Sequence, residues 1–186
     1  MKNQLKLLLQ AEKSVLLLVD VQARLLPSMA EPDGVVDRAG ILLKAAQALG
    51  VPILASEQYP AGLGPTVPAL RALLPEGAVM AKMHFSCAGD PAIADRLQSL
   101  RRPQVVLAGI EAHVCVLQTA MDLMARGHAP FVVADAVSSR APANKEVAIA
   151  RMREAGITVA TTEMVVFEWL GQAGTPVFKT LSKLIR

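Results

Sequence analysis

Six short apolar runs recur along the chain, and helix-like stretches separate them. Each run is continuous rather than alternating with polar residues, which is typical of strands buried on both faces of a parallel sheet. Because the chain is 53% hydrophobic but only 3% aromatic, its core must consist mainly of aliphatic side chains. The predicted strands cover residues 15–19, 52–55, 78–81, 105–108, 131–134 and 157–160.

Signals for helix ends support four helices between these strands. Asp90-Pro91 is typical of a helix start, and the glycines at positions 50, 127 and 156 are typical of helix ends. This alternation predicts a three-layer, Rossmann-like α/β/α sandwich with a six-stranded, mainly parallel sheet. The predicted helices cover residues 33–49, 90–100, 114–126 and 142–155.

The whole chain is expected to form one domain over residues 1–186. A chain of 186 residues has the size of one domain, and no low-complexity linker divides it. The Gly/Pro-rich stretch 57–68 is expected to be a long functional loop. Apolar residues in 171–186 indicate that this segment packs on the body of the protein or on another subunit.

Composition argues against several classes of protein. The net charge is +3, but the basic residues are scattered, so no basic stripe favours nucleic-acid binding. No segment reaches the roughly 18 uninterrupted apolar residues of a membrane span. Residues 1–10 are expected to form a short amphipathic helix rather than a signal peptide, because Glu12 and Lys13 interrupt the apolar run. Cys87 and Cys115 form neither a disulfide framework nor a metal motif, which predicts a reducing, cytoplasmic location.

Polar residues at the ends of the predicted strands are the first candidates for function, because ligands of open α/β sheets bind there. Cys115 lies at the start of a predicted helix, where free N–H groups should lower the pKa of a thiol. Asp20 could act as its base, and Lys82 could stabilise the thiolate or hold Asp20. On position alone, an inert buried cysteine is an equally good interpretation. The strand-end candidates are Asp20, Glu57, Lys82, the turn 109–115 and Asp135.

Three segments together resemble the signature of the isochorismatase-like cysteine hydrolase superfamily, which includes nicotinamidase and N-carbamoylsarcosine amidohydrolase. They are residues 18–22 around Asp20, 82–86 around Lys82, and 109–120 around Cys115, in the right order between residues 14 and 160. The loop 57–66 is similar to that of the isochorismatase-domain-containing subgroup. The resemblance implies that Cys115 is the nucleophile, Asp20 the general base and Lys82 the third member of a triad.

The resemblance also implies a cis peptide between Ile110 and Glu111. This geometry would direct the N–H groups of Glu111 and Cys115 to one point, as an oxyanion hole. Many members carry Thr or Ala where Glu111 stands, so the resemblance assigns no role to the Glu111 side chain.

Two departures from relatives concern the metal and the substrate. Nicotinamidases bind a metal through an Asp-x-His pair after the second strand, whereas this chain reads Ser56-Glu-Gln-Tyr59, so we expect neither a metal nor a cofactor. Isochorismatase itself, which cleaves a vinyl ether, typically lacks the cysteine. Cys115 therefore favours acyl chemistry on a small amide-type substrate.

Four residues near these segments are predicted to contact the substrate: Gln22, Tyr59, Phe85 and His113. For His113, a turn histidine satisfied by the backbone is the alternative. Cys87, without an expected base partner, is predicted to be structural.

The sequence thus predicts a cysteine hydrolase that acts on a small molecule and forms a homo-oligomer. One alternative is a binding or regulatory protein that keeps the fold without turnover. A nucleotide-binding Rossmann domain is disfavoured, because no Gly-x-Gly-x-x-Gly motif follows the first strand.

Overall fold

The computed structural model describes residues 8–185, and its centre is a six-stranded sheet. All neighbouring strands pair in parallel, in the order β3-β2-β1-β4-β5-β6. The predicted parallel sheet is therefore confirmed. Its strands are β1 (Ser14–Val19), β2 (Ile53–Gln58), β3 (Val79–Lys82), β4 (Gln104–Ile110), β5 (Ala129–Ser138) and β6 (Thr158–Ala160).

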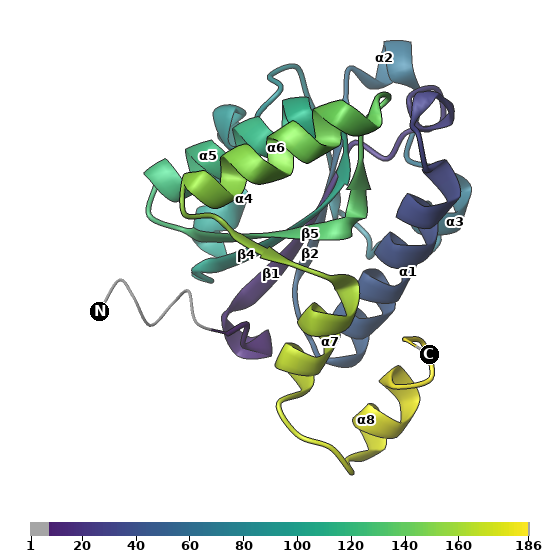
Figure 1. The fold of residues 1–186 in the computed structure, drawn as a ribbon, viewed down its shortest axis with the longest axis vertical. Coiled ribbons are helices and arrows are strands. Elements are labelled where there is room, and N and C mark those ends of the chain that lie inside the picture. The colour runs from purple at the N-terminus through teal and green to yellow at the C-terminus, as the bar shows by residue number, and fades with distance from the viewer. Residues whose placement is uncertain (1–7, 186) are drawn as a thin grey trace.

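Helices cover both faces of the sheet, as Figure 1 shows, and confirm the three-layer sandwich. One face packs against α1 (Pro32–Ala48) and α7 (Thr162–Leu170), and the short α3 (Pro68–Arg71) packs on α1. The other face packs against α4 (Pro91–Ser99), α5 (Leu117–Ala125) and α6 (Pro142–Glu154). Every residue of β1 and β4 is buried, which explains why both strands read as continuous apolar runs.

The strand order places β1 and β4 side by side at the point where the order of the sheet reverses. In open α/β sheets, this reversal opens a crevice at the carboxyl ends of the two strands, where ligands bind. Gly109 lets the strands come this close, because a Cβ atom there would overlap the carbonyl oxygen of Val19. Gly109 also has φ of 118°, which L side chains rarely adopt.

Two regions differ from the sequence prediction. The stretch 57–68 is not one irregular loop: β2 continues to Gln58, the short helix α2 (Pro60–Leu63) follows, and Gln22 forms an antiparallel bridge with Thr66. The predicted helix 114–126 begins instead with a π-helical turn, Ala112–Val116, which continues directly into α5. Cys115 therefore lies inside a wide turn rather than at the start of an α-helix.

Helix α7 was missing from the sequence prediction, although its end signals are present. The Thr161 side chain accepts a hydrogen bond from the Met164 N–H, and Gly171 ends the helix with φ of 66°. These are the usual start and stop of a helix. The nearly continuous apolar stretch inside α7 obscures its helical period.

The C-terminal segment packs on the body of the protein through α8 (Pro176–Leu181). Leu181 is buried in the core on the side of α1 and α7, and the Phe167 and Phe178 rings lie 6.4 Å apart.

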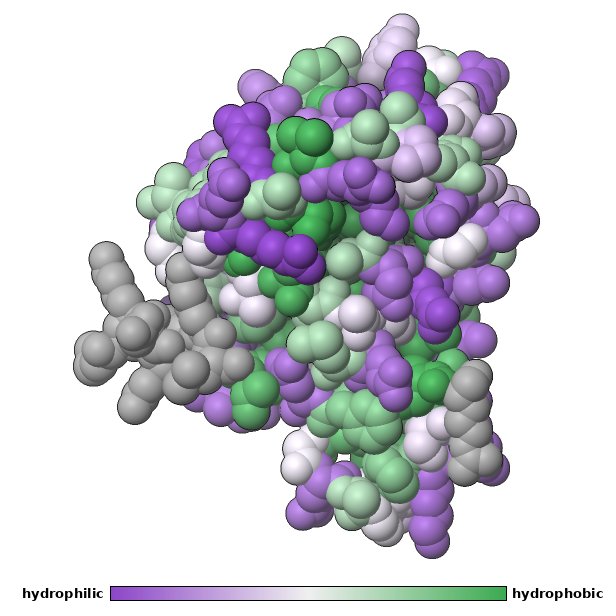
Figure 2. All heavy atoms as spheres, viewed as in Figure 1, coloured by the Kyte–Doolittle hydropathy of each residue, from purple (hydrophilic) through white to green (hydrophobic). Residues whose placement is uncertain are grey.

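The face seen in Figure 2 mixes hydrophilic and hydrophobic residues. Most of the helix expected at residues 1–10 lies outside the described residues. Within residues 8–185, no helix is long and apolar enough to cross a membrane.

Candidate active site

Asp20, Lys82 and Cys115 come from three different strand ends and meet at the carboxyl edge of the sheet. The Lys82 Nζ atom lies 2.7 Å from Asp20 Oδ2, and both side chains are fully buried. The Asp20 carboxylate is close enough to the Cys115 side chain to raise the pKa of its thiol, and Cys115 is only 6% exposed. The structure therefore brings together the three residues that the sequence singled out.

The ammonium group of Lys82 is held by four acceptors. Besides Asp20, these are Gln58 Oε1 at 2.7 Å and the carbonyl oxygens of His84 at 3.2 Å and Phe85 at 3.1 Å. Burial acts to lower the pKa of Lys82, but the Asp20 carboxylate and the nearby thiols outweigh this effect, and the pKa is raised. Since an ammonium has only three hydrogens to donate, Lys82 holds Asp20 rather than reaching outward.

Hydrogen bonds from Ser56 and, behind it, Cys87 fix the other oxygen of the Asp20 carboxylate. The Ser56 hydroxyl donates to Asp20 Oδ1 at 2.7 Å, and the Cys87 thiol donates to Ser56 Oγ at 3.3 Å. The Asp20 backbone has φ of 51° and its N–H donates to the Ser56 carbonyl oxygen at 3.1 Å. A non-glycine residue with such a backbone angle stores strain, a feature common at functional sites.

Cys87 is thus more closely connected to the site than the sequence suggested. It is fully buried, and its own N–H donates to Thr119 Oγ1 at 2.9 Å. Burial and the negative charge of Asp20 raise the pKa of the Cys87 thiol to about 11. Cys87 is a protonated donor that orients Ser56.

The pKa of the Cys115 thiol is raised, whereas the sequence predicted a lowered one. Its position after β4 suggested a lowered value, but burial, followed by the negative charge of Asp20 and a hydrogen bond to it, raises the pKa of this thiol. Lys82 acts in the opposite direction and does not compensate. Cys115 therefore rests as a thiol beside a carboxylate, and a proton must leave it during any attack.

The turn before Cys115 contains a cis peptide between Ile110 and Glu111. The N–H groups of Val114 and Val116 donate to the Glu111 carbonyl oxygen at 3.1 and 3.2 Å, which closes the turn. The Glu111 side chain points to Arg140, whose backbone N–H and guanidinium both donate to it. Burial opposes ionisation of Glu111, but the hydrogen bonds and charge of Arg140 prevail and lower its pKa.

The Gln22 side chain binds the backbone of the segment that follows β2. Its Nε2 donates to the carbonyl oxygens of Gln58 and Gly64 at 3.0 and 2.7 Å, and its Oε1 accepts from the Gln58 N–H at 2.8 Å. The side chain is fully buried. These bonds tie the segment after β2 to the end of β1, and substrate contact by Gln22 stays a prediction.

The other predicted substrate residues lie in two places. Tyr59 and Phe85 are about half exposed, on the adjacent loops after β2 and β3, and the Tyr59 N–H donates to the Lys82 carbonyl oxygen at 2.9 Å. His113 lies instead next to the end of β5, where its Nδ1 atom is 2.9 Å from Ser139 Oγ. Its partner is thus a side chain and not the backbone. Substrate contact by Tyr59, Phe85 and His113 stays a prediction.

Two further strand-end candidates have structural roles. Glu57 accepts from the Thr66 N–H and hydroxyl at 2.7 and 2.8 Å, which closes the segment after β2. Asp135 accepts from the Thr162 N–H and hydroxyl at 2.8 and 3.0 Å, at the start of α7. β5 continues to Ser138, so its end lies further along the chain than the apolar run indicated.

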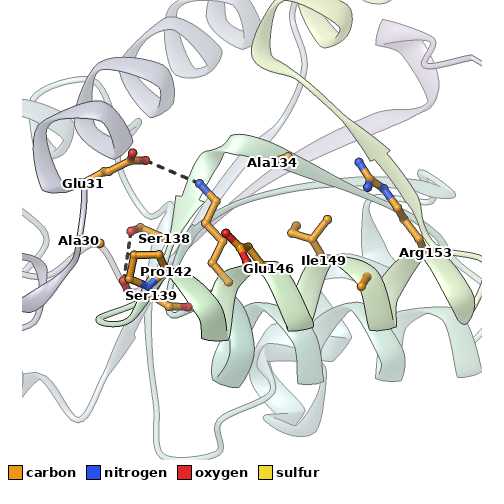
Figure 3. Close-up of a pocket in the computed structure, with 11 residues that line it drawn as sticks. Ala30, Glu31, Ala134, Ser138, Ser139, Pro142, Glu146, Ile149 and Arg153 are labelled. Atoms are coloured by element: carbon orange, nitrogen blue, oxygen red, sulfur yellow. Dashed lines mark hydrogen bonds and ion pairs between the residues drawn. The ribbon is translucent and has the colours of Figure 1, made fainter.

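A cavity of about 530 Å³ lies beside α6, between this helix and the start of α1 (Figure 3). The Lys145 ammonium lies 3.8 Å from the Glu31 carboxylate, and both residues line the cavity. Asp20, Lys82 and Cys115 do not line this cavity, so it is separate from the site.

Metal-binding groups are not gathered at the edge of the sheet. Within residues 8–185, no group of three or more His, Cys, Asp or Glu side chains is arranged to hold a metal ion. At the position of the nicotinamidase Asp-x-His pair, Gln58 instead directs its amide oxygen to Lys82.

Sequence reasoning missed Ser56, Gln58 and Arg140. Ser56 and Gln58 are two positions apart on β2, so the period of a strand places them on one face. Arg140 follows the true end of β5 by two residues. A correct end for β5 was the signal needed to find it.

The fold and this buried cluster define a class of α/β protein with a cysteine and an ion pair at the reversal point of a parallel sheet. The chain matches the family described as "Isochorismatase domain" over residues 14–164. It is 43% identical over 178 residues to isochorismatase domain-containing protein 2A of Mus musculus, which covers 94% of this chain and 84% of the relative. The protein of Homo sapiens named isochorismatase domain-containing protein 2 is also 43% identical, over 93% of this chain and 83% of its own length.

Solved structures agree with this relationship. A Caenorhabditis elegans structure named as the MAR1 ribonuclease has a TM-score of 0.89 at 37% identity, covering 95% of this chain and 91% of that one. The Escherichia coli YcaC gene product, described as an octameric hydrolase of unknown specificity, has a TM-score of 0.90 at 26% identity, covering 96% and 90%. The chain belongs to the isochorismatase family, which confirms the resemblance and indicates a hydrolase.

Proposed function

We propose that this protein is a cysteine hydrolase that cleaves the C–N bond of a small amide-type substrate. The observation that carries the proposal is the burial of the Cys115 thiol beside an Asp20 carboxylate that Lys82 and Ser56 hold in place. A thiol beside a fixed base is the arrangement that nucleophilic catalysis requires. The hydrolase described for the Escherichia coli relative supports the same general chemistry.

In the first half of the reaction, Asp20 takes the proton of Cys115 as its sulfur attacks the substrate carbonyl carbon. The N–H groups of Glu111 and Cys115 stabilise the oxyanion that forms. Asp20 then gives the proton to the leaving nitrogen, the C–N bond breaks, and a thioester on Cys115 remains. The raised pKa of Cys115 fits a proton transfer that accompanies the attack rather than a preformed thiolate.

In the second half, Asp20 takes a proton from a water molecule, and the hydroxide attacks the thioester. The same two N–H groups hold the second oxyanion. The C–S bond breaks, Asp20 returns the proton to the Cys115 sulfur, and the carboxylic acid leaves. Lys82 offsets the negative charge throughout, because its ammonium stays 2.7 Å from Asp20.

The burial of Cys115 favours a small-molecule substrate. A nucleophile that is 6% exposed is out of reach of a folded polymer, and this argues against a nucleic acid. The non-catalytic alternative is disfavoured, because Asp20, Lys82 and Cys115 are all present, Lys82 contacts Asp20, and both charges act on the Cys115 thiol. We also propose self-association in the cytoplasm, on the analogy of the octameric relative.

The proposal is tested with a panel of nicotinamide, carbamoyl compounds, ureides and short amides, assayed for ammonia release. The active substrate should leave an acyl group on the Cys115 peptide and none on the Cys87 peptide when the reaction is quenched in acid and digested. Cys115→Ala should abolish both ammonia release and acylation. Turnover that survives in Cys115→Ala, or acylation at another residue, contradicts the proposal.

A further inference from the structure

Arg140 forms an ion pair with Glu111, which belongs to the turn that contains Cys115. Arg140 Nη2 donates to Glu111 Oε1 at 2.8 Å, and Nε lies 3.2 Å from both carboxylate oxygens. The Arg140 backbone N–H donates to Oε2 at 3.0 Å. One residue therefore supplies donors to both oxygens of Glu111.

The pair lies at the same sheet edge as Asp20 and Cys115. Ile110 is in register with Ser138 on β5, so Glu111 and Arg140 leave two neighbouring strand ends. The Glu111 carbonyl oxygen accepts from Val114 and Val116, which places Cys115 in the same turn. The Glu111 side chain is 8% exposed and that of Arg140 is 61% exposed, so the guanidinium faces solvent over the carboxylate.

Two ion pairs lie at this edge of the sheet. Asp20 is neutralised by Lys82, and Glu111 by Arg140. A guanidinium presents five N–H donors in a planar fork that suits a carboxylate. In this chain Glu111 already occupies that fork from inside the protein.

We propose that Glu111 determines substrate specificity, because its carboxylate occupies the hydrogen-bond donors of the Arg140 guanidinium. The enzyme then selects amides without a negative charge near the reacting carbonyl. This inference rests on the proposed function and names its substrate class. Without the Glu111 side chain, Arg140 would attract and hold an external carboxylate, and the preference would shift to anionic substrates.

Two alkylating reagents of nearly equal size test this without a known substrate. Iodoacetamide is neutral and iodoacetate is anionic, and with each a C–S bond forms at Cys115, iodide leaves, and the thiol proton passes to Asp20. Rates are followed at pH 7.5 by peptide mass spectrometry, which separates Cys115 from Cys87. The quantity measured is the ratio of the iodoacetate rate to the iodoacetamide rate at Cys115, divided by that of free N-acetylcysteine.

In the wild type this ratio should lie at or below one. In Glu111→Ala and in the isosteric Glu111→Gln it should rise by about threefold to tenfold, the order of effect expected of one unpaired unit charge in a partly solvated site. Adding Arg140→Gln to Glu111→Ala should return the ratio to the wild-type value. The rise should shrink at 1 M salt, where the Debye length is only about 3 Å.

The ratio separates charge from structure. A merely structural role for Glu111 would change the two rates by the same factor, because the reagents differ only in charge. A reactive Cys115 whose ratio changes by less than twofold in both Glu111 variants overturns this inference alone, as does a rise that persists after Arg140→Gln. A Cys115 that reacts with neither reagent overturns the proposed function together with the inference.

Discussion

Replacing Lys82 with methionine should destabilise the protein far more than the ion pair itself contributes. Lys82 Nζ lies 2.7 Å from Asp20 Oδ2, and neither side chain is exposed. At an effective dielectric constant of about 20, two unit charges at this separation attract by about 6 kcal/mol. Removing both ions from water costs several kcal/mol each, so the intact pair has a small net effect. Lys82→Met leaves Asp20 buried and unpaired, at a cost of about 3–5 kcal/mol.

Urea unfolding measures this loss, and Trp169 is a convenient probe because it is the only tryptophan and is buried. The matched control is the double variant Asp20→Asn/Lys82→Met, which removes the charge as well. It should recover about 2 kcal/mol or more of the loss.

The outcome that refutes this reasoning is specific. If Lys82→Met costs less than about 1 kcal/mol, or if the double variant is as unstable as the single one, the pair is not a buried charge pair of the kind described.

Three further substitutions follow from the structure. Folding raises the pKa of Cys87 to about 11, so this thiol ionises at lower pH in the unfolded chain than in the folded one. Between pH 9 and 11 the free energy of unfolding of the wild type should therefore fall by about 2–3 kcal/mol more than that of Cys87→Ala. Equal pH slopes of the two proteins in urea unfolding would argue against this. Gln22→Ala should lower the free energy of unfolding by about 1–3 kcal/mol and speed proteolysis within residues 57–66. Unchanged cleavage would show that the Gln22 hydrogen bonds do not hold that segment. Gly109→Ala should lower the free energy of unfolding by about 4 kcal/mol or more, because its Cβ would overlap the Val19 carbonyl oxygen. A soluble variant that unfolds like the wild type would refute the close approach of residue 109 to Val19.

The general fold was predictable because burial on both faces leaves a mark in the sequence. Continuous aliphatic runs and glycine stops predicted six parallel strands and most of the large helices, and the structure confirms them. Strand ends were less accurate: β5 runs to Ser138, four residues beyond its apolar run, because Asp135 lies inside the strand and is satisfied by Thr162.

The candidate site was predictable in its residues but not in its chemistry. Asp20, Lys82 and Cys115 could be selected because strand ends of a parallel sheet meet at one edge. Their contacts could not, since Ser56, Gln58 and Cys87 become partners only when three separate segments fold together.

The sequence by itself determined the class of fold, the edge of the sheet where function belongs and the residue types available there, because these depend on local hydrophobic pattern and chain direction. Only the tertiary structure decided which charges pair and how the thiol titrates. Burial beside Asp20 raises the pKa of Cys115, although its place in the chain suggested the opposite. Arg140 meets Glu111 at two neighbouring strand ends, although the two residues are 29 positions apart in the chain. Electrostatics depends on distance and burial in three dimensions, and neither quantity is written in the order of the residues.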